Sequence, residues 1–143
     1  MKVLLNITSS VGDSKLFVVS YTPSPSNNAK VDIVWTNKEH KPSVPEERQR
    51  SESMGGQIWV TPSLMENTNG EKLTSRVRCT MYSGSELALA MSRSIGDPDG
   101  TRVGVVSHPD VDILTKPPHA HWFVVAASDG LLDFHPSTKL LSY

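Results

Sequence analysis

The stretch FVVAASDGLLDF, Phe123 to Phe134, decides how the rest of the chain is interpreted. Its first half is a run of apolar and small residues, and with Trp122 before it we expect a buried strand from Trp122 to Ala127. The run leads directly into an acidic loop that carries Asp129 and Asp133. Asp-Gly pairs are common in plain turns, because Asp caps its own backbone and Gly supplies positive φ. Taken alone, the stretch favours a buried strand that ends in an ordinary turn.

Length and composition predict one folded domain with long polar loops. The chain has 143 residues, of which 37% are hydrophobic and 20% charged, and this size allows a real core. Fourteen Lys and Arg face fifteen Asp and Glu, so the net charge of -1 does not favour nucleic acid or membrane surfaces as partners. Cys79 is the only cysteine, which fits a reducing compartment. With no signal-peptide pattern and no membrane-length apolar run, we expect an intracellular protein, cytoplasmic or nuclear.

Short runs rich in β-branched and aromatic residues predict most of the secondary structure. We expect Val3 to Ile7 and Leu16 to Tyr21 to pair as a hairpin. Further strands are predicted at residues 31–36, 57–60, 103–106 and 111–114. Polar stretches near residues 22–30 and 62–84 are predicted to be surface insertions.

Two helices are predicted. In HKPSVPEERQRSESMGG, Ser43 and Glu46 fit a capping box, Pro45 fits the first turn, and Gly55-Gly56 ends the run. ELALAMSRSI, residues 86–95, contains good helix formers and is followed by helix-breaking Gly and Pro residues. The fold class is therefore a β-rich α+β with antiparallel sheets.

Four carboxylates lie in turns or at strand ends: Asp13, Asp97, Asp129 and Asp133. Carboxylates that converge on one end of a sheet can bind Mg²⁺ or Mn²⁺, which prefer oxygen ligands. The same Asp-Gly and Gly-Asp pairs also suit plain turns. On spacing alone, turns are favoured over a metal site.

Two other chemistries fit isolated residues only. Ser14 in Gly-Asp-Ser could be an esterase nucleophile with Asp133 and His135. That family arrangement requires two residues between the Asp and the His, whereas only Phe134 separates them here. His119 and His121 would share one side of a strand, but no further ligand completes a zinc site.

The remaining candidates are one thiol and three guanidinium groups. Cys79 is most simply a small buried hydrophobe. Arg76, Arg78 and Arg93 could hold a phosphate through bidentate hydrogen bonds, but their spacing is not evidence of it.

Five segments in order resemble successive motifs of the type 2C (PPM-type) metal-dependent protein serine/threonine phosphatases. They are VGDSKLFVV, EHKPSVPEERQRSESMGG, LALAMSRSIGD, GVVSHPDVDIL and FVVAASDGLLDF. Five blocks in order are far more specific than any one of them, and they extend over nearly the whole chain apart from the insertions.

The resemblance implies a sandwich of antiparallel sheets flanked by helices, here a partial one, with a two-metal Mg²⁺ or Mn²⁺ centre. Such a centre activates a water that attacks phosphoserine or phosphothreonine of a phosphorylated protein. By position, Asp129 matches a direct metal ligand, and Asp13 matches a residue that helps hold a weaker third metal in some members. Asp97, Arg93 and Gly130 match supporting or structural positions. Under this resemblance Ser14 is not expected to be a nucleophile.

Several family motifs are not found in this sequence. They are the Asp-Gly-His-Gly-type loop with the metal-bridging Asp, the Arg that binds the substrate phosphate, and the late Gly-Asp-Asn block. The chain is therefore expected to be the middle portion of a phosphatase domain, one partial domain over residues 1–143, and inactive by itself. The alternative is a non-catalytic phosphatase-like binding module.

Overall fold

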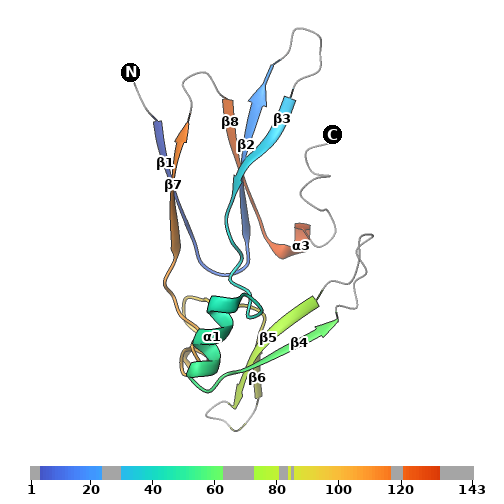
Figure 1. Cartoon of the computed structure of the whole chain (residues 1–143), viewed down its shortest axis with the longest axis vertical. Helices are drawn as coiled ribbons and strands as arrows, with labels where there is room; N and C mark the ends of the chain where they lie inside the picture. Colours follow the sequence, from blue (N-terminus) through green and yellow to red (C-terminus); the bar gives the residue numbers. More distant parts are fainter. Residues whose placement is uncertain are drawn as a thin grey trace. The chain divides into compact units, whose positions relative to one another are not determined.

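The computed structural model describes residues 4–23, 30–62, 73–80, 84, 86–116 and 121–132. They divide into two compact units. Unit 1 lies within residues 1–10, 14–38 and 110–143, and unit 2 within residues 11–13 and 39–109. Both units are built on antiparallel sheets with a few short helices, so the predicted α+β class is confirmed. Figure 1 shows the elements coloured along the sequence.

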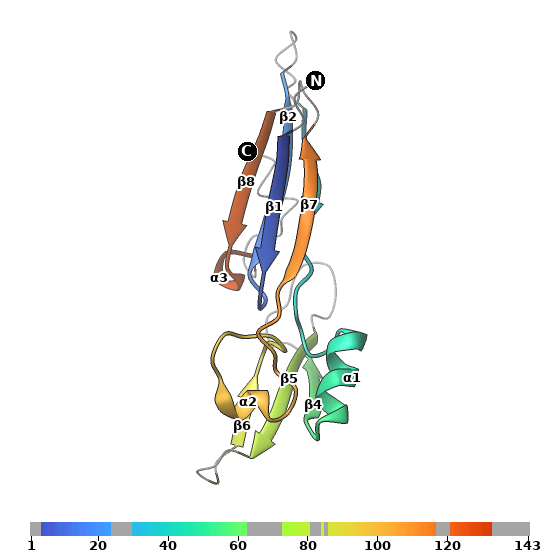
Figure 2. The same ribbon diagram turned by 90° about the vertical axis from the view of Figure 1, so that its left-hand side faces the viewer.

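Unit 1 contains two sets of paired strands (Figures 1 and 2). In the first, β1 (Leu4–Ser10) pairs antiparallel with β7 (Asp110–Lys116). In the second, β2 (Lys15–Thr22) is the central strand between β3 (Lys30–Thr36) and β8 (His121–Ala127). Phe17, Val18 and Val19 of β2 are buried. Helix α3 (Asp129–Leu132) follows β8 after one residue.

The predicted hairpin between Val3–Ile7 and Leu16–Tyr21 is wrong, although both runs lie in strand regions. β1 pairs with β7, for example Ile7 with Ile113, more than a hundred residues away in sequence. β2 instead pairs with β3 and β8. Strand propensity marks an extended segment but does not select its neighbour, so adjacency in sequence misled the prediction.

The strand predicted to be buried at Trp122 to Ala127 exists as β8 but is largely exposed. Phe123, Val124 and Val125 are 57%, 62% and 38% exposed. β8 forms the edge of its three-stranded sheet, so the prediction of burial is wrong for the described residues. An apolar run identifies a strand, whereas burial depends on what packs against its faces.

Unit 2 combines α1 (Pro45–Ser53) with a three-stranded sheet in the order β4-β5-β6. Its strands are β4 (Gln57–Pro62), β5 (Leu73–Thr80) and β6 (Glu86–Leu89), and α2 (Pro98–Thr101) follows them. Val77, Val103 and Val105 form its small core, with Ile58 and Leu89 packed against them. β5 falls within the stretch predicted as an insertion at 62–84, yet it is the central strand of this sheet. Residues 63–72, 81–83 and 85, like most of the other insertion, lie outside the described residues.

Two local predictions in unit 2 are wrong. Residues 86–89 form a strand rather than the start of a helix, because Ala88 and Leu89 pair with Arg78 and Val77 of β5, and this pairing outweighs their helix propensity. The strand predicted at 103–106 is reduced to one bridge between Val106 and Arg93.

The predicted capping box is also absent. Val44 is the N-cap of α1, and no side chain caps the helix. The backbone N–H of Ser43 donates to Ser75 Oγ of β5 at 3.1 Å. The prediction placed the cap one residue too early, whereas Pro45 in the first turn and the end of the helix before Gly55 are confirmed.

Candidate functional site

Asp129 lies at the end of a strand, where the sequence placed it. β8 ends at Ala127, and Asp129 is the first residue of α3, whose turn is closed by a hydrogen bond from the Leu131 N–H to the Ser128 carbonyl at 3.2 Å. The structure describes the backbone of Asp129 but not its side chain. Gly130 is the exposed second residue of α3. Asp133 and His135 lie outside the described residues.

Asp13 lies in the turn between β1 and β2, in unit 2, and a buried histidine holds this turn. His40 is 2% exposed. Its backbone N–H donates to the Gly12 carbonyl at 3.0 Å, and its Nδ1 accepts from the Gly12 N–H at 3.1 Å. Gly12 has a φ of 95°, which favours glycine. His40 is therefore a clamp on the loop that carries Asp13.

The described residues do not complete a metal site. No group of three or more His, Cys, Asp or Glu side chains that could hold a metal occurs among them. Asp13 and Asp129 belong to different units. Their carboxylates are the donor type that Mg²⁺ and Mn²⁺ prefer, but one or two such groups are too few for a closed site. The metal roles of Asp129 and Asp13 stay predictions.

A buried carboxylate organises unit 2 instead. Glu47 of α1 is 2% exposed. Its Oε1 accepts from Arg93 Nε at 2.9 Å and Nη2 at 2.6 Å. Its Oε2 accepts from Arg50 Nη2 at 2.5 Å and lies 2.6 Å from Ser92 Oγ. One carboxylate thus satisfies two guanidinium groups and a hydroxyl, as a buried charge requires.

These contacts set the protonation state of Glu47. Burial by itself raises the pKa of a carboxyl group. The hydrogen bonds from Arg50, Arg93 and Ser92, together with the charge of Arg50, outweigh burial and lower the pKa of Glu47 from 4.5 to about 2. Glu47 is therefore a permanent anion at neutral pH.

The same network joins α1 to the segments on both sides of α2, through Ser92 before this helix and Gly104 after it. Arg50 Nε donates to the Gly104 carbonyl at 2.8 Å, and Arg50 Nη2 donates to the Ser92 carbonyl at 2.9 Å. The Ser92 N–H donates to the His40 carbonyl at 2.8 Å. Hydrogen bonds therefore connect the clamp on the Asp13 loop, through Ser92, to Glu47.

Arg93 and Asp97 occupy fixed positions in the loop that precedes α2. Besides binding Glu47, Arg93 donates from Nη1 to the His108 carbonyl at 3.0 Å. Asp97 accepts a hydrogen bond from Ser94 Oγ, and its carbonyl accepts from the Thr101 N–H at 3.0 Å. Asp97 has a φ of 51°, a strained conformation that these bonds hold. Both residues make structural contacts, while any support of a metal centre stays a prediction.

The other candidates of the sequence are dispersed. Arg93 is engaged with Glu47, whereas Arg76 and Arg78 lie on β5. His121 is exposed at the start of β8, and Cys79 lies in β5 with a side chain that the structure does not describe. His119 lies outside the described residues.

Sequence reasoning missed Glu47 and His40. Glu47 lies in PEERQRSES, which has no apolar residue except Pro45 and is typical of a short polar helix. A usable signal was its spacing of three residues from Arg50, which puts both on one face of a helix. No local pattern marks His40, because its partners Gly12 and Ser92 are distant in sequence.

Comparison with known proteins defines the class. The antiparallel fold resembles serine-threonine phosphatase 2C from Toxoplasma gondii, with a TM-score of 0.69 and 22% identity, over 96% of this chain and 42% of that chain. A family model described as protein phosphatase 2C matches residues 6–142. The chain therefore belongs to the protein phosphatase 2C family.

The relatives are longer than this chain. It is 29% identical over 139 residues to "Probable protein phosphatase 2C 12" of Oryza sativa subsp. japonica, which is 95% of this chain and 31% of that protein. It is 30% identical over 121 residues to the human integrin-linked kinase-associated serine/threonine phosphatase 2C, which is 85% of this chain and 24% of that protein. The chain spans about a third or less of the length of these relatives. In the part of the chain that the structure describes, no helix is long and apolar enough to cross a membrane.

Proposed function

We propose that this chain is part of a metal-dependent protein serine/threonine phosphatase domain, which hydrolyses phosphoserine and phosphothreonine in proteins. The observation that carries the proposal is the match of the protein phosphatase 2C family model to residues 6–142. The match extends over both units, and over the segments that hold Asp13, Glu47, Arg93 and Asp129.

Within that function, Asp129 would contribute one oxygen ligand to a Mg²⁺ or Mn²⁺ centre. Such a centre, when bound, would supply an activated water and a positive charge to neutralise the developing charge on the phosphate. A single carboxylate does not hold Mg²⁺ tightly, so this chain contributes to the centre without completing it. The Glu47 network keeps the loops of Asp13 and Asp97 in fixed conformations, which is what a precise site needs from its surroundings.

A chimera tests the proposal directly. The segment of human integrin-linked kinase-associated serine/threonine phosphatase 2C that aligns with this chain is replaced by the sequence of this chain. We expect the chimera to release phosphate from a phosphothreonine peptide in the presence of millimolar Mn²⁺. Asp129→Asn should lower the rate at least about a hundredfold, because it removes a metal ligand. Asp112→Asn, which changes an exposed strand residue of unit 1, should leave the rate unchanged.

A folded chimera without Mn²⁺-dependent turnover would refute the proposal and favour a non-catalytic binding module. Circular dichroism and thermal unfolding of the chimera establish that it is folded. Full activity of the Asp129→Asn chimera would refute the role given to Asp129 while leaving the family function intact.

A further inference from the structure

The sheet of unit 2 has one face that its core does not use. Gln57 is paired with Arg78 in register, and Trp59 is paired with Arg76. Because directly opposed residues of antiparallel strands project to the same side, these four side chains share one face. Val77, which alternates with Arg76 and Arg78, points to the other face and is buried in the core. The face away from the core therefore carries an indole and two guanidinium groups.

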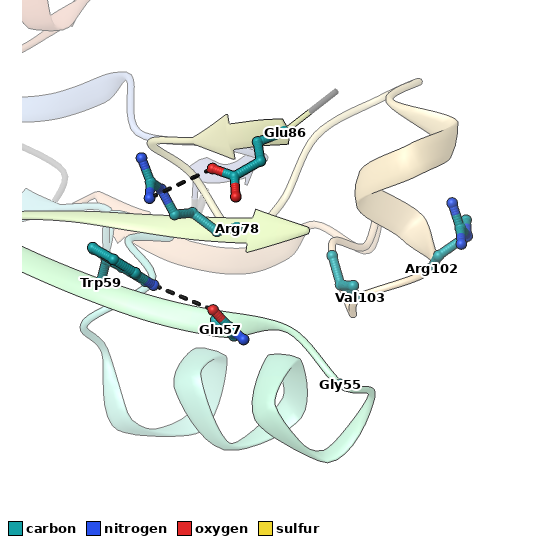
Figure 3. Close-up of a pocket in the computed structure, with 7 residues that line it drawn as sticks. All are labelled: Gly55, Gln57, Trp59, Arg78, Glu86, Arg102 and Val103. Carbon is teal, nitrogen blue, oxygen red and sulfur yellow. Dashed lines mark hydrogen bonds and ion pairs between the residues drawn. The ribbon is translucent and has the colours of Figure 1, made fainter. Parts of the chain in front are cut away.

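A pocket of about 330 Å³ opens on this face, close to the end of α1 (Figure 3). It is lined by Gly55, Gln57, Trp59, Arg78, Glu86, Arg102 and Val103. The guanidinium carbon of Arg78 lies 4.4 Å from the centre of the Trp59 ring, which orients the cation against a half-exposed indole. In Figure 3, Arg78 lies between Trp59 and Glu86, and Arg102 comes from the segment after α2 at the other end.

The charges around this pocket favour an anionic ligand. The lining carries two guanidinium groups, Arg78 and Arg102, and one carboxylate, Glu86. Arg78 Nη1 is 3.7 Å from Glu86 Oε2, which is longer than a hydrogen bond, and the Glu86 side chain is 71% exposed. Arg78 thus keeps hydrogen-bonding capacity toward a further carboxylate or phosphate oxygen.

The donors of the pocket suit carboxylates better than a phosphate dianion. The backbone N–H of Gly55 already donates to the Glu52 carbonyl at 3.1 Å, so it is not part of an amide cradle of the kind that binds phosphate. Two guanidinium groups from separate segments line the pocket beside a flat indole: Arg78 on β5, and Arg102, whose Nη1 also lies 3.4 Å from Asp99 Oδ1. This arrangement fits successive acidic side chains of an extended segment.

We propose that this pocket binds an acidic peptide segment of another protein, with Arg78 and Arg102 contacting its carboxylates and Trp59 packing against its backbone or aliphatic groups. The proposal does not depend on phosphatase activity, since it concerns binding by unit 2 alone.

The test is a titration of the chain with a fluorescein-labelled peptide of six glutamates, followed by anisotropy. We expect saturable binding that weakens with added salt, and a loss of affinity of about fivefold in Arg78→Gln and in Arg102→Gln. The matched control is Arg48→Gln, which removes the same charge from an exposed ion pair with Glu52 in α1 and should leave the affinity unchanged. In a ¹H–¹⁵N spectrum of the unaltered chain, the indole N–H signal of Trp59 should shift on addition of the peptide.

Equal losses in Arg78→Gln and Arg48→Gln would overturn the proposal, because they would indicate general charge attraction. Failure of the Trp59 signal to move at millimolar peptide would also overturn it, and this measurement needs no variant. Inorganic phosphate that competes at a lower concentration than the peptide would overturn the choice of carboxylates. Binding of hexaglutamine as tight as that of hexaglutamate would refute the role of charge.

Discussion

Replacement of Glu47 by glutamine should destabilise unit 2 strongly, although the two side chains have nearly the same shape. Glu47→Gln removes the anion that neutralises Arg50 and Arg93, and it places an amide NH₂ next to groups that only donate. Removing one member of a buried ion pair costs about 3–5 kcal/mol, because the remaining charges are left uncompensated. We expect a loss of about 3 kcal/mol in the free energy of unfolding.

The pKa of Glu47 gives a second route to this magnitude. Its value falls from 4.5 to about 2 on folding, and each pKa unit corresponds to about 1.4 kcal/mol, so the charged form contributes about 3 kcal/mol. Because the folded pKa is the lower one, this stability is fully present above pH 4.5. It is lost as the pH falls from 4.5 towards 2.

Urea unfolding at pH 7 and at steps down to pH 2 measures both effects. Since the chain has two units, hydrogen exchange of the Ser92 amide, which donates to the His40 carbonyl, reports on unit 2 specifically. Glu52→Gln is the matched control, because Glu52 makes an exposed ion pair with Arg48 and should cost at most about 0.5 kcal/mol. The reasoning fails if Glu47→Gln costs no more than Glu52→Gln. It also fails if the difference between wild type and Glu47→Gln persists at pH 2.

Three further outcomes are expected. His40→Leu should cost about 1–3 kcal/mol in urea unfolding, because it leaves the buried Gly12 N–H without an acceptor. His108→Leu, which changes an exposed histidine, should cost little. Equal costs would argue that His40 does not hold the Gly12 turn. Gly104→Ala should cost about 1–2 kcal/mol more than Gly84→Ala in thermal unfolding. Both glycines have a positive φ, but only at Gly104 would an added Cβ lie 2.9 Å from Ser51 Cα. Similar losses in the two variants would show that the segment around Gly104 relaxes. The chain by itself should release no phosphate from a phosphothreonine peptide in millimolar Mn²⁺, because its sequence has neither the Asp-Gly-His-Gly loop nor the Gly-Asp-Asn block that would supply further metal ligands. Turnover that Asp129→Asn abolishes would contradict this.

The helix predicted at residues 86–95 shows where local reasoning fails. Ala and Leu in ELALAM are strong helix formers, yet residues 86–89 join β5 as a strand. The hairpin predicted from Val3–Ile7 failed for a related reason, since the partner of β1 is β7. Propensity is a property of a short segment, whereas pairing is a choice among all strands of the chain.

The sequence by itself determined the α+β class, most of the strand segments, the family and the place of Asp129 at the end of β8. These follow from apolar runs, turn residues and the order of motifs, which are properties of local sequence. Only the tertiary structure decided that Glu47 is a buried anion and that His40 holds the Gly12 turn. It also decided that Arg93 binds Glu47 whereas Arg78 packs against the ring of Trp59. The physical reason is that a charge can be buried only where distant segments supply its partners, and those partners are fixed by folding rather than by spacing.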